Sequence, residues 1–482
     1  MSKILTSNAT VLASFLLILQ FFTFNYAQDF EVRIRIEATA TMKAEITVTL
    51  PENNKAESLW FLDRYGEESG LLTERFSRLN CYDRQGVLVA RKLLSAGERI
   101  DLSDIRKLAY TVDLTPRPGQ FAAAHVSWMK VDGGLVVLDD LLPQEVGSSA
   151  KISFELPLGW KLAGFEKPGV GVAVPDIGKA VFWAGSNIRG QTSGPLRLVI
   201  SDEWRFSDAE ATAMAASIFQ EYLKDFGPPT NSNTEIRLAK FPIAVTFGNW
   251  EADTRGSSVT IISSDMPFKS PSLQRLHEQL RHELFHLWIP NGLNLSGNYD
   301  WFYEGFALYQ SLKIGVDVNR LRFDDFLDSL SRAYEIDSAQ KSRTSLIDAS
   351  RQRWSGSNTQ VYARGMLLAF ICDVAMLNAS GGKRSITDLI KEVISKHNTN
   401  TSRTDGNAAL IAIFKSHREI APMADRYISG TEPFPSEMAR VLAGIEIEQL
   451  GQNSKFKITA KPSGKQKRLL EKLGIDNWRK RI

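Results

Sequence analysis

The chain has 482 residues, of which 43% are hydrophobic, 10% aromatic and 23% charged, and its formal net charge is +3. These fractions are typical of a globular protein, and they exclude a disordered chain, a collagen-like repeat and a coiled coil. The small net charge gives no indication of a nucleic-acid partner, and we expect none. Two cysteines, Cys81 and Cys372, are too few for a disulfide-stapled scaffold; they could form one bridge or none.

The first 27 residues have the pattern of a secretory signal peptide. Lys3 supplies a positive charge, an apolar run covers Val11 to Phe24, and Ala27 precedes the expected cut. This run is shorter than the about 20 apolar residues that a spanning helix needs. We therefore expect residues 1–27 to be removed and the chain to act outside the cytoplasm, in a periplasm or as a secreted protein. The alternative is an uncleaved N-terminal membrane anchor.

The region 28–205 is predicted to be an N-terminal β-sandwich-like module. Apolar and charged residues alternate from Phe30 to Glu37, and the alternation returns from Met42 to Leu50. This is the period of a half-buried strand. Short apolar runs between Gly, Pro and Asp residues continue as far as Ile200. No catalytic group of residues is visible here, and His125 stands alone between small residues.

The pattern changes to mixed helices and strands at Ser207. Ser207 and Glu210 form an S-x-x-E capping box, which predicts a helix that ends at Gly227. Strand-like runs follow at 235–247 and 258–262. The pattern therefore indicates a small sheet with helices in this part of the chain.

Helical patterns dominate after residue 270. Ser270-Pro271 is typical of an N-cap followed by a first helical residue, and this helix should end before Pro290. Another helix is expected to begin near Asp300, and helical patterns continue to about Lys415.

The helix that begins at Ser270 carries metal-binding residues. Residues 282–286 read H-E-L-F-H, an H-E-x-x-H motif. His282 and His286 are four residues apart and lie on one helical face, so both imidazoles can reach one cation. Zinc suits them because imidazole is a good zinc ligand and the ion accepts tetrahedral geometry. Glu283 lies beside the metal, where it can take a proton from a metal-bound water.

A catalytic zinc needs a third protein ligand and one open coordination position. The third histidine of the metzincin continuation is absent, because no histidine follows His286 until His397. Glu304, which lies 18 residues after His286, stands in an apolar helical segment where a charge needs a partner. We therefore expect His282, His286 and Glu304 to bind one Zn²⁺ per chain.

The segments H-E-L-F-H-L-W at 282–288 and W-F-Y-E-G-F-A-L-Y at 301–309 resemble those of the gluzincin metallopeptidases. This group contains thermolysin, aminopeptidase N and the glycyl aminopeptidases. G-N-W-E-A at 248–252 resembles the G-x-x-E segment that aminopeptidases of this clan carry upstream of the zinc helix. Y-A-R-G at 362–365 resembles their Tyr-x-Lys-Gly, with Arg in the place of Lys, and D-R-Y-I-S-G-T-E at 425–432 resembles the end of the glycyl aminopeptidase catalytic region.

The resemblance implies roles for individual residues. Glu283 is the general base, Tyr362 stabilises the transition state, and Glu251, with Gly248 in the same segment, binds the free α-ammonium of a substrate. The alternatives are a solvated turn glutamate at position 251 and a core tyrosine at position 362. The implied architecture consists of the β module, a thermolysin-like catalytic domain over 206–315, a helical C-terminal part over 316–447 and a basic tail over 448–482.

The sequence thus predicts a secreted zinc peptidase, most simply an aminopeptidase that acts on peptide or protein substrates. Two other classes stay open: a thermolysin-type zinc endopeptidase, which would not need Glu251, and a non-catalytic binding protein on a peptidase fold. Residues 455–482 carry ten Lys/Arg against two acids, a local charge of +8. We expect this tail to be a solvated end that could contain one short helix; the alternative is weak contact with an anionic surface.

Overall fold

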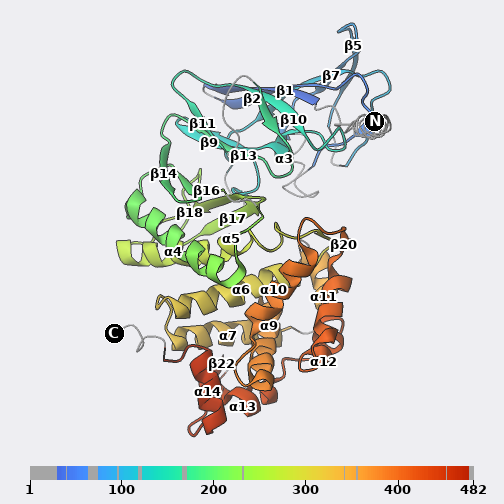
Figure 1. Cartoon of the computed structure of the whole chain (residues 1–482). Helices are drawn as coiled ribbons and strands as arrows, with labels where there is room; N and C mark the ends of the chain where they lie inside the picture. The colour runs from blue at the N-terminus through green and yellow to red at the C-terminus, as the bar shows by residue number, and fades with distance from the viewer. Residues whose placement is uncertain are drawn as a thin grey trace, which may run out of the picture. The chain divides into compact units, whose positions relative to one another are not determined.

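The computed structural model describes most of the chain after the expected signal segment, and residues 1–27 lie outside the described residues. The described ranges are 30–39, 41–62, 74–94, 97–117, 122–164, 171–230, 233–340, 342–353, 356–451 and 453–476. The chain divides into two compact units, coloured by residue number in Figure 1. Unit 1 takes its described residues from Met1–Thr115, Leu138–Leu158 and Glu166–Gly178, and unit 2 from Pro116–Val137, Gly159–Phe165 and Lys179–Ile482.

Unit 1 is built on a seven-stranded sheet. Its elements are β1 (Phe30–Ala38), β2 (Met42–Thr49), β3 (Ser58–Leu59), β4 (Leu79–Tyr82), β5 (Leu88–Lys92), β6 (Ile100–Asp101), β7 (Lys107–Asp113), α3 (Leu138–Leu141), β10 (Ala150–Glu155) and β12 (Val172–Val174). The sheet order is β12-β10-β1-β2-β7-β4-β5, and β3 pairs with β6. The predicted alternation from Phe30 is confirmed, since every second residue of β1 from Phe30 to Ile36 is buried.

Unit 2 contains two larger sheets. The first, ordered β11-β13-β9-β8, consists of β8 (Trp128–Lys130), β9 (Gly133–Val137), β11 (Lys161–Ala163) and β13 (Val181–Gly185). The second, ordered β14-β15-β16-β18-β17, consists of β14 (Arg189–Ser193), β15 (Leu196–Ile200), β16 (Thr234–Lys240), β17 (Trp250–Arg255) and β18 (Ser258–Ser263). The predicted boundary at residue 205 therefore moves, because β15 pairs in parallel with β16 and belongs to unit 2.

Two helices, α4 (Asp208–Phe226) and α5 (Lys269–Phe285), cover one face of the five-stranded sheet (Figure 1). The predicted capping box of α4 is confirmed, and Gly227 ends the helix with a positive φ of 74°. Helix α5 begins earlier than predicted, with Phe268 at the N-cap, so that Ser270 lies inside the first turn. It ends at Phe285, before Pro290 as expected.

The helical part follows as predicted. Its elements are α6 (Asp300–Asp317), α7 (Phe323–Ser338), α8 (Leu346–Arg351), α9 (Asn358–Ser380), α10 (Ile386–His397), α11 (Gly406–Ser416), α12 (Ala421–Met423), the π-helix η3 (Ala424–Ile428) and α13 (Ser436–Ala443), with β19 (Leu295–Ser296) paired to β20 (Thr404–Asp405). Among the described residues, α9 alone is long and apolar enough to cross a membrane, and 89% of its most apolar window is buried in the protein, as in a core helix. Cys372 in α9 and Cys81 in β4 are both buried with free thiols.

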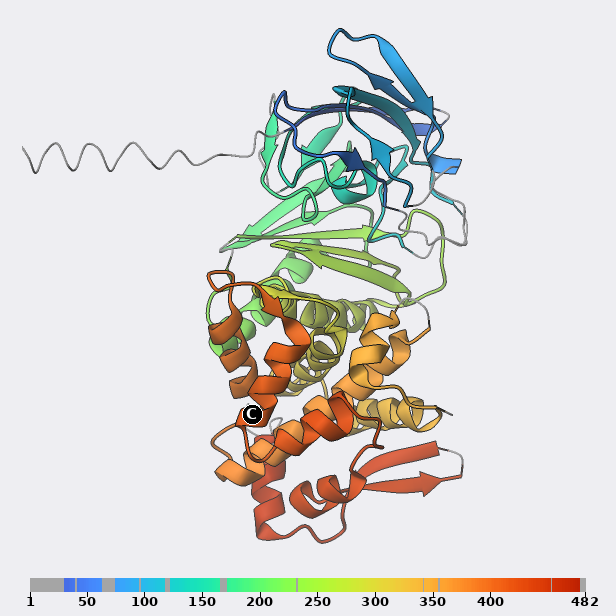
Figure 2. The same cartoon turned by 90° about the vertical axis from the view of Figure 1, so that its right-hand side faces the viewer.

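The region predicted to be a solvated basic tail is packed structure over its described part. It forms the hairpin β21 (Ile445–Leu450) and β22 (Asn453–Ile458), followed by α14 (Gly464–Lys472). Figure 2 shows this hairpin, in red, beside the helical part of the chain. Phe456 of β22 is buried, with its ring 5.8 Å from that of Tyr334 in α7 and 6.2 Å from that of Phe370 in α9.

Candidate metal centre and substrate site

Three side chains from two helical segments converge on one point in unit 2. His282 lies in the last turn of α5, His286 is its C-cap residue, and Glu304 stands near the start of α6. Nε2 of His282 is 3.3 Å from Nε2 of His286 and 3.2 Å from Oε2 of Glu304, which is 3.6 Å from His286 Nε2. All three residues are buried, and their ligand atoms lie within 4.8 Å of one another. The structure thus brings together the three predicted metal ligands.

The donor set fits a zinc ion. His286 Nδ1 is 2.9 Å from the carbonyl oxygen of Ile289, so in the neutral ring Nδ1 donates a hydrogen bond and Nε2 keeps its lone pair for a metal. Oε2 of Glu304 is buried and accepts no hydrogen bond of ordinary geometry from the described residues. Such an oxygen costs free energy unless a cation or donor meets it. Two imidazoles and one carboxylate are a known ligand set of catalytic zinc, with a fourth position left open.

The charges around this point favour a cation. Burial opposes ionisation of Glu304, but the two imidazoles and Arg353 outweigh it and hold the pKa of Glu304 well below its usual range. Burial also disfavours the imidazolium of His286, yet Glu304 and Glu283 raise the pKa of His286 to about 9. Without a metal, this ring therefore attracts a proton. A bound cation would replace that proton, because metal ligands must be deprotonated.

Glu283 lies beside the three ligands. Its Oε1 is 4.0 Å from His282 Nε2, and its Oε2 accepts a hydrogen bond of 2.8 Å from Oγ1 of Thr254 in β17. Burial raises the pKa of Glu283 above its ordinary value. A carboxylate that is held in place and has a raised pKa is suited to act as a general base. Thr254 belongs to no motif in the sequence, so its contact with Glu283 could not be predicted.

Helix α9 brings Tyr362 to the same place. The ring of Tyr362 is 6.2 Å from that of His282, and burial raises the pKa of its hydroxyl well above the usual value. Its Oη accepts a hydrogen bond of 2.8 Å from Arg353, which stands between α8 and α9. Arg353 also pairs with Glu304 and with Asp300. No sequence motif contains Arg353, so its place at the site could not be predicted.

The approach of α6 and α9 depends on two glycines. A Cβ atom on Gly305 would lie 2.4 Å from Cα of Gly365, and one on Gly365 would lie 2.5 Å from the carbonyl oxygen of Trp301. Neither distance is tolerable between backbone atoms, so only glycine fits at this crossing. Glu304 directly precedes Gly305, and Tyr362 lies three residues before Gly365. The crossing therefore places Glu304 and Tyr362 at one site.

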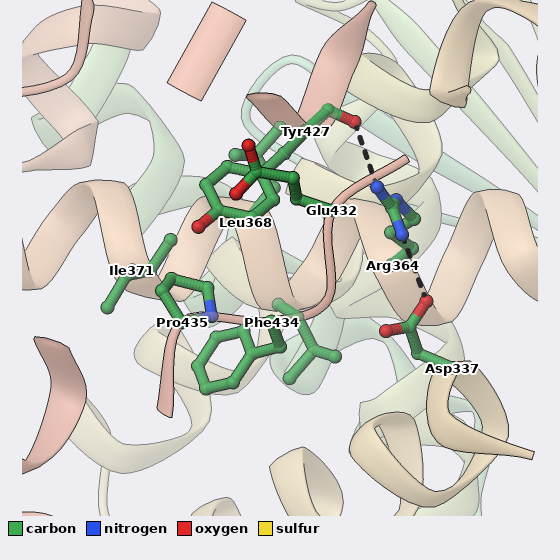
Figure 3. Close-up of a pocket in the computed structure, with 9 residues that line it drawn as sticks. Asp337, Arg364, Leu368, Ile371, Tyr427, Glu432, Phe434 and Pro435 are labelled. Carbon is green, nitrogen blue, oxygen red and sulfur yellow. Dashed lines mark hydrogen bonds and ion pairs between the residues drawn. The ribbon is translucent and has the colours of Figure 1, made fainter. Parts of the chain in front are cut away.

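Arg364, which replaces the lysine of the related motif, has a structural role. Figure 3 shows its guanidinium between Asp337 of α7 and the backbone of Tyr427, beside a small pocket. Its Nη1 is 3.4 Å from Asp337 Oδ1, and its Nη2 donates to the carbonyl oxygens of Tyr427 and Gly430 at 3.4 and 3.3 Å. Arg364 thus ties α9 to α7 and to the chain around η3.

Glu251 lies within β17, at one end of the strand order, whereas the sequence predicted strands only at 235–247 and 258–262 in this part of the chain. This strand could not be predicted because its residues, W-E-A-D-T-R, are mostly polar. In the structure they are only partly buried. Trp250 and Thr254 face α5, since the Trp250 ring is 6.2 Å from that of His282 and Thr254 contacts Glu283. Side chains alternate along a strand, so Glu251 points to the other side of β17.

A loop of unit 2 covers that side of β17. The backbone N–H of Ala124 donates to Oε2 of Glu251 at 3.4 Å, and Nδ1 of His125 is 3.2 Å from Oδ2 of Asp253. Burial raises the pKa of Glu251. His125, which the sequence left without a partner, therefore stands beside the predicted amine-binding carboxylate. Gly248 occupies the turn before β17 with a φ of 77°, a conformation that favours glycine.

Solved structures with the same fold are metallopeptidases and a related hydrolase. An aminopeptidase N family protein from Idiomarina loihiensis matches with a TM-score of 0.71 and 14% identity, over 90% of this chain and 82% of that one. An M1 zinc metallopeptidase from Deinococcus radiodurans, bound to a Tyr-Ser-Ala substrate, matches with a TM-score of 0.52 and 15% identity, over 84% of this chain and 94% of that one. Yeast LTA4 hydrolase matches with a TM-score of 0.50 and 13% identity, over 91% and 70%.

No protein-family model matches the sequence, and no curated protein matches it. The structural matches show that the chain has an M1 peptidase-like fold, with mixed sheets and a helical C-terminal part. The predicted resemblance to the gluzincins is thus confirmed at the level of the fold.

Proposed function

We propose that the chain is a zinc-dependent aminopeptidase with one zinc ion per chain, held by His282, His286 and Glu304 in a thermolysin-like catalytic region. The observation that carries this proposal is the buried cluster of these three residues with Glu283 beside it, in an M1 peptidase-like fold. The Deinococcus radiodurans protein of the same fold binds a Tyr-Ser-Ala substrate. This supports a peptide as the substrate of the present chain.

Each residue around the three ligands has a separate role in peptide hydrolysis. When bound, zinc lowers the pKa of a water molecule and polarises a carbonyl. Glu283, with its raised pKa and its hydrogen bond from Thr254, accepts the proton of the attacking water. The hydroxyl of Tyr362 donates a hydrogen bond to the carbonyl oxygen as negative charge develops on it.

Glu251 distinguishes an aminopeptidase from an endopeptidase. A peptidase that acts on chain ends needs a group that recognises the free end, and a carboxylate can bind an α-ammonium by a charge-assisted hydrogen bond. We assign this role to Glu251 because its segment resembles that of the aminopeptidases; its half-buried side chain lies on the side of β17 that faces the loop with Ala124, opposite to the side that faces the zinc helix. An acetylated substrate brings no positive charge and leaves this carboxylate unpaired. A thermolysin-type endopeptidase would not need Glu251, because it does not bind the free end of its substrate.

The test combines metal analysis with a matched pair of substrates. We expect wild-type protein with one bound zinc to cleave a free-amine tripeptide and largely to ignore its N-acetylated form. Glu251→Ala should depress cleavage of the free-amine peptide while zinc content stays normal, and Glu278→Ala, at an exposed site on α5, should change neither. Equal rates on free and acetylated peptides in the wild type would refute the aminopeptidase and favour the endopeptidase.

We further propose that the enzyme acts outside the cytoplasm, as a periplasmic or secreted protein. The support is the charge and apolar pattern of residues 1–27. The N-terminal sequence of the protein purified from its host tests this proposal. A chain that begins at Gln28 supports export and cleavage, and an intact N-terminus recovered in the cytoplasmic fraction contradicts them.

A further inference from the structure

Arg353 is a largely buried cation that connects several groups of the proposed active site. Its side chain is 10% exposed. Its Nη1 lies 2.9 Å from Oε1 of Glu304 and 3.0 Å from Oδ1 of Asp300, and its Nη2 donates to Oη of Tyr362 at 2.8 Å. Its Nε donates to Oδ1 of Asn358 at 3.2 Å. Both branches of the guanidinium group and its Nε are therefore engaged.

The contact with Glu304 separates the two oxygens of that carboxylate. Oε1 is held by Arg353, and Oε2 faces the imidazoles of His282 and His286. A carboxylate that is free to rotate could present both oxygens to a metal and so fill an additional coordination position. A catalytic zinc needs that position open for water and substrate. Arg353 therefore favours coordination through Oε2 alone.

The contact with Tyr362 sets the direction of its hydroxyl. Because Oη accepts a hydrogen bond from a cation, the proton of the hydroxyl points away from Arg353 and can be donated elsewhere. The guanidinium carbon also lies 5.3 Å from the centre of the Tyr362 ring, within the range of a cation–π interaction. Asp300 balances the charge of Arg353, so the pair adds no net charge to the site.

We propose that Arg353 is a positioning residue that holds Glu304 in single-oxygen coordination and at the same time directs the hydroxyl of Tyr362. This inference rests on the proposed zinc peptidase function. The geometry needs arginine in particular, because one planar fork reaches a carboxylate and a phenol oxygen at once. Lysine would supply the charge as a single point and could not hold both groups in the same way.

The first part of the test measures zinc binding and does not depend on catalytic activity. Zinc affinity is measured by competition with a chromogenic chelator for wild type, Arg353→Gln and Arg353→Lys. We expect both variants to bind zinc about 10- to 100-fold more weakly, the usual effect of losing a group that orients a ligand. The visible spectrum of the cobalt-substituted protein should change as well, because it reports coordination geometry. Arg351→Gln is the matched control, since Arg351 is 65% exposed and pairs with Asp348 on its own helix.

The catalytic arm is a double-mutant cycle with Tyr362→Phe. Loss of an oxyanion donor lowers kcat by about 100- to 1000-fold, with KM little changed. If Arg353 acts through the Tyr362 hydroxyl, Arg353→Gln should lower kcat less in the Tyr362→Phe background than in wild type. If Arg353→Gln does not fold, as judged by its melting curve, Arg353→Lys takes its place in the cycle.

Either of two results overturns the proposal. The first is a zinc affinity within about twofold of wild type in both Arg353 variants, well below the usual effect of such a group. The second is a loss of kcat in the double variant that equals the product of the losses in the two single variants. Failure of the proposed function would look different. If zinc-loaded wild type cleaved no peptide, the zinc and cobalt measurements would still decide whether Arg353 holds Glu304, and an unchanged cobalt spectrum would refute that role.

Discussion

The acidic side chains around the candidate metal centre differ in the proton affinity that their surroundings give them. The histidines and Arg353 hold the pKa of Glu304 well below its usual range despite its burial, which suits a permanently ionised ligand. Burial raises the pKa of Glu283, which suits a group that gains and loses a proton during reaction. Two carboxylates with pKa values pushed apart indicate a division of roles between them. Here, one would bind the metal and the other would transfer protons.

This division predicts different results for two substitutions of similar size. Glu304→Gln weakens one of three protein ligands, so zinc content and activity should fall together. Glu283→Gln keeps all three ligands, so the protein should retain about one zinc per chain and lose nearly all activity. Zinc is measured by atomic spectrometry after exhaustive dialysis, and activity on the free-amine tripeptide. Full zinc occupancy and activity in Glu304→Gln would show that the third ligand is elsewhere.

The half-buried carboxylate of Glu251 should reduce stability at neutral pH. Burial raises its folded pKa above 4.5, so the folded state binds the proton more tightly than the unfolded state, and stability falls as pH rises through the folded pKa. Glu251→Gln should therefore raise Tm at neutral pH, and the gain should vanish as pH falls below that pKa. Glu251→Gln should also raise KM for free-amine peptides, because it removes the charge proposed to bind the α-ammonium. Melting curves of wild type, Glu251→Gln and the exposed control Glu278→Gln provide the comparison. A lower Tm for Glu251→Gln at neutral pH would mean that its protein contacts already satisfy the carboxylate.

At the residue scale, the sequence predicted the groups whose spacing follows from helix geometry. His282 and His286 are recognisable because a helix places residues four apart on one face. Arg353 and Thr254 were not predictable, because they reach the site from a loop and from a polar strand through tertiary packing alone. His125 has a partner only after the fold brings its loop against β17.

The crossing of α6 and α9 is the element-scale feature on which the site depends. Gly365→Ala would place a methyl group 2.5 Å from the carbonyl oxygen of Trp301. We expect it to lower the free energy of unfolding by about 1–3 kcal/mol, the usual cost of overpacking, although alanine is normally the better helix former. Zinc affinity should fall as well, because Glu304 would move with α6.

Gly464→Ala provides the control, since Gly464 lies in α14 and a Cβ there would meet only a side-chain atom at 3.9 Å. Urea denaturation and chelator competition measure the two quantities. A more stable Gly365→Ala protein with unchanged zinc affinity would show that the two helices can separate without consequence for the site.

Elements with strong end signals were predicted well. Helix α4 has the capping box at Ser207 and the terminal Gly227 that its sequence indicates. Strand β17 was missed because only one edge of it is paired and its residues are mostly polar, so no apolar alternation marks it. The prediction was therefore weakest at the strand that carries Glu251.

At the scale of the whole molecule, the candidate site draws on chain segments far apart in sequence. The contacts of its side chains involve Thr254, His282, Glu304, Arg353 and Tyr362, all of which belong to unit 2. The sequence predicted that the region after residue 315 supplies Tyr362, but it did not indicate Arg353, which lies in the segment before α9. The extent of such a site cannot be predicted from hydrophobic periodicity. Periodicity reports local structure, whereas the unit is defined by long-range packing.

The C-terminal region provides a test of this packing, because its sequence indicated a solvated end. Phe456 is 1% exposed, its ring lies 5.8 Å from that of Phe434, and its backbone N–H donates to Ser331 of α7. Phe456→Ala should therefore lower the free energy of unfolding by about 3–5 kcal/mol, as for other buried aromatic residues. Phe247→Ala, at a side chain that is 64% exposed, should change it by no more than about 0.5 kcal/mol. Urea denaturation of the two variants beside wild type measures both changes. If Phe456→Ala were as stable as Phe247→Ala, β22 would not be part of the folded core, and the end of the chain would be solvated as its charge suggests.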